Sequence, residues 1–166
     1  ANEPDQFQTT SYDYDAPIAE GGGLTDKYYV TRLVNMLANH MGRYLATAFM
    51  EDPGVWIHNT TDSRNLIGDL GRWVILTNNG KRDVKDVSIS LPDGQKTLNV
   101  SLEPFGAAAI PVDLALTPEI TLDYANCMPL GFFADRVLVL HGPVGWQAEL
   151  SLDGKVLTAA IPDGDE

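Results

Sequence analysis

One change in the hydrophobic pattern constrains the fold of this chain more than any other feature. Between residues 29 and 44, apolar side chains recur every three or four positions, which predicts an amphipathic helix. After the turn-forming run Glu51-Asp52-Pro53-Gly54, short alternating segments follow at intervals of roughly 8–12 residues, with turn residues between them. The sequence therefore predicts two parts: residues 1–50, which contain the helix, and residues 51–166, which form an antiparallel β-sandwich or a barrel.

The predicted helix has a clear start and a less regular end. Thr25 is a suitable N-cap residue, and Asp26 places a negative charge in the first turn, where the helix dipole favours it. Gly42 is expected to end or bend the helix, with residues 43–48 forming a short additional turn. The apolar stripe of the helix is broad, so the helix needs a large surface to pack against.

Strand patterns cover most of the second part. Val87–Leu91 and Leu98–Leu102 alternate on either side of Pro92-Asp93-Gly94, which predicts a β-hairpin with one buried face. Further strands are expected at Arg72–Thr77, Ala108–Val112, Ile120–Tyr124, Val137–Leu140, Ala148–Leu152 and Val156–Ile161, the last two joined by a turn at Asp153-Gly154.

The three tryptophans allow two interpretations. Trp73 and Trp146 belong to strand patterns, and we expect them in the core because large aromatic side chains in such positions are usually buried. Alternatively, these two residues and Trp56 form a platform for a sugar on the sandwich.

Composition and charge exclude several classes of function. The chain has 166 residues, of which 44% are hydrophobic and 20% charged, as in a folded globular protein. Its net charge of −12 is spread along the sequence without a basic stripe, which argues against a nucleic-acid partner. We expect a soluble protein without a membrane partner, because no apolar run approaches the roughly 18 residues of a spanning helix. The sequence does not indicate whether its compartment is cytoplasmic or extracellular.

No metal or cofactor site is predicted. His40, His58 and His141 are scattered and lack the spacing of metal ligands, and His40 is expected to be structural. Cys127 is the only cysteine, so no intrachain disulfide can form, and we expect a buried thiol. The Gly21-Gly22-Gly23 run precedes a helix without the lysine of a phosphate-binding loop, which favours a simple turn.

The candidate functional segment lies near the start of the sequence. Residues 7–14 are predicted as the end of a strand, which Pro17 stops. In an extended backbone, Tyr12 and Tyr14 point to one side, and Asp13 and Asp15 to the other. Tyrosine offers a sugar a flat apolar face and a hydroxyl group, so one interpretation is a sugar site. The other is an acidic surface turn with two half-buried tyrosines.

A family resemblance adds to this interpretation. The run Ser11-Tyr12-Asp13-Tyr14-Asp15-Ala16-Pro17-Ile18, followed by Glu20, Leu24-Thr25-Asp26-Lys27-Tyr28 and Arg32, closely resembles the last barrel strand and helix of family 35 glycoside hydrolases, the β-galactosidases. Residues 136–142 and 146–150 are similar to the first β-sandwich domain of that family. The glycines at positions 21–23 depart from the family pattern, in which this loop has fewer glycines.

The resemblance implies a mostly β fold. It makes residues 1–50 the last strand-loop-helix unit of a (β/α)8 TIM barrel and residues 51–166 the β-sandwich that follows, together a fragment of a larger multidomain enzyme. The parent would be a retaining glycoside hydrolase that removes terminal β-galactose without a cofactor. Its catalytic Glu pair would precede Ala1, so the resemblance places no catalytic residue in this chain and implies that the isolated chain is inactive.

The resemblance also assigns roles and partners. Tyr14 would line the galactose pocket, Tyr12 would support it, and Asp13 and Asp15 would hold the segment in place. Asp13 and Asp15 as a catalytic pair is a weaker alternative, because their spacing suits a supporting role better. The chain would contact a β-galactoside and the rest of the catalytic barrel. The competing hypothesis is a non-catalytic carbohydrate-binding or scaffolding β-sandwich module, whose helix docks on a partner.

Overall fold

The computed structural model describes residues 16–19, 21–50, 56–58, 62–92, 94 and 96–163, with the backbone alone for residues 56–58. The chain divides into two compact units, residues 1–39 and residues 40–166. The predicted strand end at residues 7–14 and the side chain of Trp56 lie outside the described residues.

Helix α1 spans Asp26–Leu45, so Thr25 occupies the predicted N-cap position. Gly42 does not end the helix, which was one of the two predicted alternatives, because α1 continues through it for three more residues. Glycine inside a helix costs about 1 kcal/mol relative to alanine. That cost is offset here because Met41 and Tyr44, on either side of Gly42, are fully buried and the Tyr44 hydroxyl donates to the carbonyl oxygen of Leu116 at 3.2 Å.

The rest of the described chain is built of strands. Their bounds are β1 Phe49–Met50, β2 Trp56–His58, β3 Asp62–Gly68, β4 Gly71–Thr77, β5 Val84–Ser90, β6 Thr97–Leu102, β7 Ala107–Ala115, β8 Thr121–Ala125, β9 Met128–Phe133, β10 Val137–His141, β11 Gln147–Leu152 and β12 Lys155–Ala160. Every strand predicted for residues 51–166 is present within a few residues, and β5 and β6 pair as the predicted antiparallel hairpin.

Four strands were not predicted: β1, β2, β3 and β9. β3 mixes polar and apolar residues without regular alternation, and β9 contains Pro129 and Gly131, which normally weaken a strand. β9 tolerates them because it pairs only with β10 in a two-stranded sheet, and the register of that pair shifts next to Pro129.

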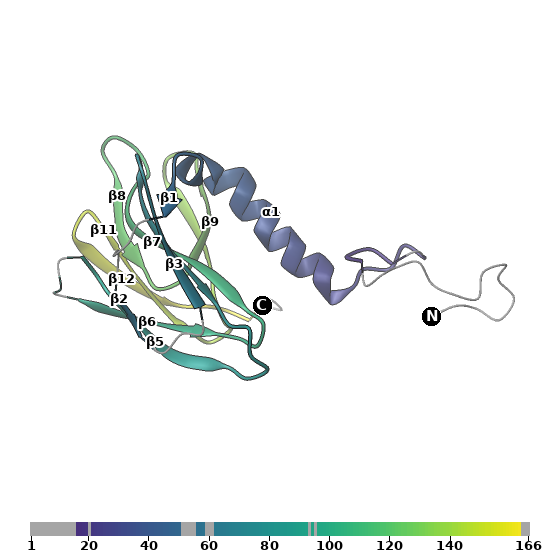
Figure 1. The fold of residues 1–166 in the computed structure, drawn as a ribbon. Coiled ribbons are helices and arrows are strands. Elements are labelled where there is room, and N and C mark those ends of the chain that lie inside the picture. The colour runs from purple at the N-terminus through teal and green to yellow at the C-terminus, as the bar shows by residue number, and fades with distance from the viewer. Residues whose placement is uncertain are drawn as a thin grey trace, which may run out of the picture. The chain divides into compact units, whose positions relative to one another are not determined.

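Two sheets stacked face to face make the second unit a β-sandwich, as predicted. A seven-stranded sheet has the order β1-β3-β4-β7-β8-β11-β12, and a three-stranded sheet has the order β2-β5-β6 (Figure 1). Alternate apolar residues of β4, β5, β6, β7 and β8 meet between the sheets, and the most buried include Leu76, Ile89 and Ile110. Burial of these side chains is the main favourable term for folding of this unit.

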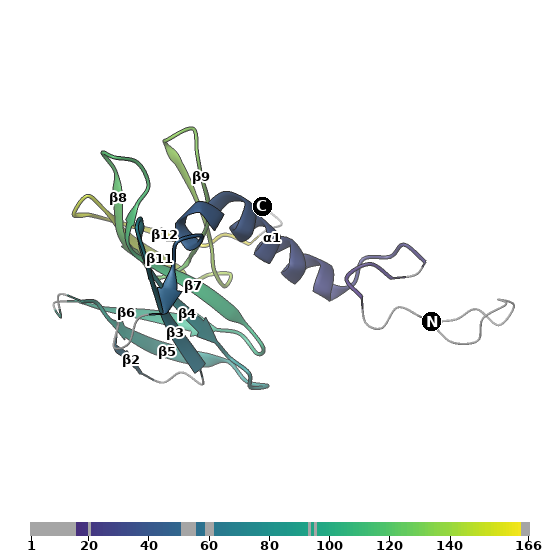
Figure 2. The ribbon, with the colours of Figure 1, turned by 45° about the horizontal axis from the view of Figure 1, so that its top comes forward.

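The β9–β10 hairpin lies on the other face of the large sheet, against β7, as Figure 2 shows. Because Val74 and Leu76 point into the core between the sheets, Trp73 points to this opposite face. Trp73 is completely buried, which confirms the prediction for this tryptophan. Among the described residues, no group accepts a hydrogen bond from its Nε1.

Candidate functional site

The predicted sugar-contacting residues, Tyr12 and Tyr14, lie outside the described residues. Asp13 and Asp15, predicted to support them, do as well. The roles of all four residues therefore remain predictions. The structure does describe the loop that follows them and leads into α1.

This loop is a hydrogen-bonded turn. The amide of Gly22 donates to the carbonyl of Ala19 at 2.8 Å, and Ile18 and Leu24 form an antiparallel bridge across the turn. The Thr25 hydroxyl lies 2.9 Å from the carbonyl oxygen of Ala16 and 3.1 Å from that of Pro17. The chain directly after the tyrosines is thus tied to the first turn of α1 by Thr25, and the predicted Gly-rich turn is confirmed.

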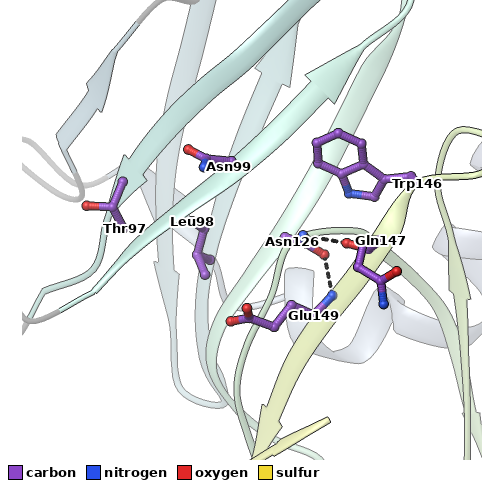
Figure 3. A pocket seen from close by; sticks show the side chains of 7 residues that line it. All are labelled: Thr97, Leu98, Asn99, Asn126, Trp146, Gln147 and Glu149. Atoms are coloured by element: carbon purple, nitrogen blue, oxygen red, sulfur yellow. Dashed lines mark hydrogen bonds between the residues drawn. The ribbon is translucent and has the colours of Figure 1, made fainter. Parts of the chain in front are cut away.

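A second candidate site is a polar groove on the sandwich. It has a volume of about 270 Å³ and is formed where the start of β6 approaches the start of β11. Its lining residues are Thr97, Leu98, Asn99, Asn126, Trp146, Gln147 and Glu149. Figure 3 shows Trp146 on one side of the groove and Thr97 and Asn99 on the other. Most of these side chains are polar, and together they leave one large aromatic ring accessible.

Asn126 fixes the floor of this groove. Its side chain is 8% exposed and bridges to β11: the amide Nδ2 donates to the Gln147 carbonyl at 3.1 Å, and Oδ1 accepts from the Glu149 amide at 2.8 Å (Figure 3). These bonds continue the pairing of β8 with β11 one step past Ala125. A buried amide whose donor and acceptor are both used makes a rigid support, because breaking either bond leaves a buried polar group unpaired.

The charges of the groove cancel each other. Lys96 forms an ion pair with Glu149, and its Nζ also lies 2.6 Å from the Tyr124 hydroxyl, which is 3.1 Å from Glu149 Oε1. The bond to Lys96 lowers the pKa of Glu149, while the bond to Glu149 raises the pKa of Lys96. Both groups therefore stay charged at neutral pH, and the pair presents no net charge to a ligand.

The core prediction for Trp146 is wrong, because this residue is only half-buried. It follows a turn in which its amide donates to the Pro143 carbonyl at 3.0 Å, with Gly145 at a φ of +73°. The turn places Trp146 just before β11, at the rim of the sandwich. Sequence reasoning also missed Asn126, Lys96 and Glu149, since nothing in the local sequence around any of them indicates their contacts.

Cys127, His141 and His40 are described by the structure, and each has a structural environment. Burial raises the pKa of the Cys127 thiol to about 11, which keeps it protonated and unreactive, as expected of a buried thiol. Burial lowers the pKa of His141, an effect that the charge of Glu103 partly opposes. The ring of His40 packs edge-on against the ring of Phe133, with 4.8 Å between the two ring centroids. Within the described part of the chain, no group of three His, Cys, Asp or Glu side chains could hold a metal ion, and no helix is long and apolar enough to cross a membrane.

Comparison with known proteins gives a short but specific similarity. No family model matches the chain. One segment is 62% identical over 34 residues to the β-galactosidase of Canis lupus familiaris, 66% identical over 32 residues to that of Felis catus, and 59% identical over 32 residues to that of Homo sapiens. Each match covers 19–20% of this chain and 5% of the length of the relative. The chain therefore contains a β-galactosidase-related region.

Proposed function

We propose that this chain is part of a β-galactosidase-like glycoside hydrolase of family 35, which removes terminal β-galactose with retention of configuration. The observation that carries the proposal is the identity of 59–66% with curated β-galactosidases over 32–34 residues. In this proposal the similar segment is the one that contains residues 9–32, where the family resemblance lies. The complete enzyme of which this chain is a part would be a hydrolase that acts on a β-galactoside.

In the proposed arrangement, residues 1–50 are the last strand-loop-helix unit of a (β/α)8 barrel. Working residues of such barrels stand at the C-terminal ends of the strands, which is where Tyr12 and Tyr14 would lie. Tyr14 would contact the sugar, Tyr12 would support it, and Asp13 and Asp15 would hold the segment. The bonds of Thr25 to Ala16 and Pro17 support this arrangement, because they fix the direction of the chain directly after these residues.

The helix supports the barrel assignment in a second way. The described residues of the first unit leave Tyr29, Val30 and Val34 largely exposed, although all three belong to the apolar stripe of α1. The last helix of a (β/α)8 barrel packs its apolar face against the neighbouring units of the barrel. We propose that the rest of the catalytic barrel covers these residues, and that residues 51–166 brace it.

The proposal assigns no catalytic residue to this chain. Retaining hydrolysis of this kind uses two carboxyl groups about 5–5.5 Å apart, one as nucleophile and one as acid and base. The rest of the barrel would supply both, and no cofactor is required. This chain would supply one wall of the sugar pocket, where a phenol hydroxyl orients the substrate.

The first test is the mass of the native polypeptide together with the activity of this chain. A barrel alone takes roughly 250 residues, so the proposal expects a native mass above 18.1 kDa by at least most of a barrel. The isolated 166-residue chain should not hydrolyse an aryl β-galactoside. Saturable turnover by this chain that is lost in Asp13→Asn or Asp15→Asn would overturn the proposal and assign catalysis to that pair.

The second test addresses Tyr14 in the complete enzyme. Tyr14→Phe removes one hydrogen bond to a charged or polar partner in the pocket, and we expect kcat/KM to fall by about 10–100-fold. Thr158→Ala, an exposed change on β12, is the matched control and should leave kcat/KM unchanged. An unchanged kcat/KM in Tyr14→Phe would remove Tyr14 from the pocket.

The alternative, a non-catalytic carbohydrate-binding or scaffolding β-sandwich module, predicts different results. A native polypeptide of 18.1 kDa without hydrolase activity would favour that module.

A further inference from the structure

We propose that the groove between β6 and β11 binds a neutral pyranose sugar, with the indole ring of Trp146 as its platform. All seven residues that line this groove lie in the second unit. It is a different site from the predicted Tyr12–Tyr14 segment. The inference therefore does not depend on the function proposed above.

The accessible aromatic ring is the first reason. The indole of Trp146 extends toward β6 in Figure 3, and this half-buried residue lines the groove. The face of an aromatic ring carries partial negative charge, which attracts the weakly positive C–H groups on the flat side of a pyranose ring. In contrast to Trp73, which is completely buried, Trp146 is available for such stacking.

The polar groups around the ring are the second reason. Asn99 and Gln147 are exposed, and their planar amides each offer a donor and an acceptor to the paired hydroxyl groups of a sugar. The Ser88 hydroxyl donates to Asn99 Oδ1 at 3.3 Å, which orients the amide so that its NH2 group can donate to a ligand. An apolar ligand would cover these amides without satisfying them, at a cost in free energy.

The charge of the site selects a neutral ligand. Lys96 and Glu149 neutralise each other, so neither a phosphate nor an ammonium group finds an unpaired counter-charge there. The net charge of −12 on the chain further disfavours anionic ligands. Because Lys96 and Glu149 remain paired at neutral pH, this selectivity holds under ordinary conditions.

The groove is also preformed and of suitable size. The two bonds of Asn126 and the backbone bonds of Trp146 to Pro143 and Ile161 hold the floor and the Trp146 side of the groove in place, so a ligand need not order them. The volume of about 270 Å³ lies just below the range of about 300–1,000 Å³ typical of drug-sized ligands, which suits one small ring. An open groove of this size should bind weakly, with a Kd of about 1 mM.

The test is a titration of the 15N-labelled chain with methyl β-D-galactopyranoside and methyl β-D-glucopyranoside, followed by the indole N–H resonances of the tryptophans. The resonance of Trp146 is assigned from its loss in Trp146→Phe. We expect this resonance to shift with saturation, while that of Trp73 does not move. Glycerol, a polyol without a ring, is the ligand control. No saturable shift, or an equal response to glycerol, would overturn the proposal.

Single-residue variants distinguish sugar binding in the groove from binding at other sites. Asn99→Ala and Gln147→Ala change exposed side chains and should each weaken binding by about 3–10-fold, as expected for one lost hydrogen bond. Thr158→Ala on β12 should not affect binding. If Tyr14→Phe abolishes binding while the two groove variants do not, the sugar binds at the N-terminal segment instead, which refutes this inference and supports the proposed function.

Discussion

The two units of this chain differ in how far they bury their apolar residues. The second unit buries a contiguous apolar core within itself, in which Leu76, Ile89 and Ile110 are completely inaccessible to solvent. In the first unit, Tyr29, Val30 and Val34 are more than half exposed. A unit that covers its own core can fold independently, whereas the exposed apolar stripe in the N-terminal part of α1 depends on other parts of a protein for burial.

Sequence similarity and burial give different information about this chain. The similarity to β-galactosidases covers 19–20% of the chain, which is too little to include the core residues spread from Val74 to Tyr124. Sequence similarity thus points to a functional family through a short segment, while burial identifies the part that can fold alone. The hydrophobic pattern of residues 51–166 by itself predicts a β-sandwich or a barrel, and the structure shows the sandwich.

The largest expected effect tests this difference in packing. Leu76→Ala removes a fully buried side chain and should lower the free energy of unfolding by about 2–5 kcal/mol. Val34→Ala changes a side chain that is 59% exposed and should alter it by no more than about 0.5 kcal/mol. Urea denaturation of the 166-residue chain measures both. A similar loss in the two variants would mean that the helix is packed as tightly as the sandwich.

The second prediction compares two glycines with positive φ. A Cβ at Gly71, where φ is +134°, would lie 2.4 Å from the carbonyl oxygen of Asp113, whereas one at Gly22, where φ is +84°, would meet nothing within 4 Å. Gly71→Ala should destabilise the sandwich by about 1–3 kcal/mol, because the backbone strain of a positive φ adds to a clash with rigid backbone atoms. Gly22→Ala carries only the strain of about 1 kcal/mol, confined to the turn. The loss of stability in both variants is measured by thermal unfolding. Equal losses in the two variants would contradict this prediction.

The sandwich was largely predictable because its information is local. Apolar residues alternate within Val87–Leu91 and Leu98–Leu102, which predicts one buried face. The turn residues between these two segments predict the hairpin. The prediction failed where packing outweighed local preference. α1 continues through Gly42 because Tyr44, two residues further on, is buried. β9 forms in spite of Pro129 because its pair with β10 shifts register there.

The polar groove was not predictable, because no local pattern brings its residues together. Asn126 and Glu149 are joined only by the pairing of β8 with β11, and Lys96 reaches Glu149 from the start of β6. Trp146 was expected in the core because it precedes an alternating segment. The turn at Gly145 places it at the rim instead. For the Tyr12–Asp15 segment, sequence remains the only source of the assignment.

The smallest expected effect concerns the ion pair that borders the groove. The bond to Lys96 lowers the pKa of Glu149 in the folded chain, so the contribution of this carboxylate to stability is present above its ordinary pKa of 4.5. It is lost as pH falls through the lowered folded value. Glu149→Gln should therefore reduce the free energy of unfolding at pH 6, and the difference from the unmodified chain should shrink below about pH 4.5.

The size of this effect is limited by solvent, because the two side chains are 34% and 32% exposed. We expect about 0.2–1 kcal/mol at pH 6, measured from urea midpoints across the pH range. Lys96→Gln is the matched variant, and a double-mutant cycle with Glu149→Gln isolates the pair. A coupling of zero at pH 6 would show that the charges contribute no stability. The pair would then serve only to keep the groove neutral, which is the property that the sugar-binding inference requires.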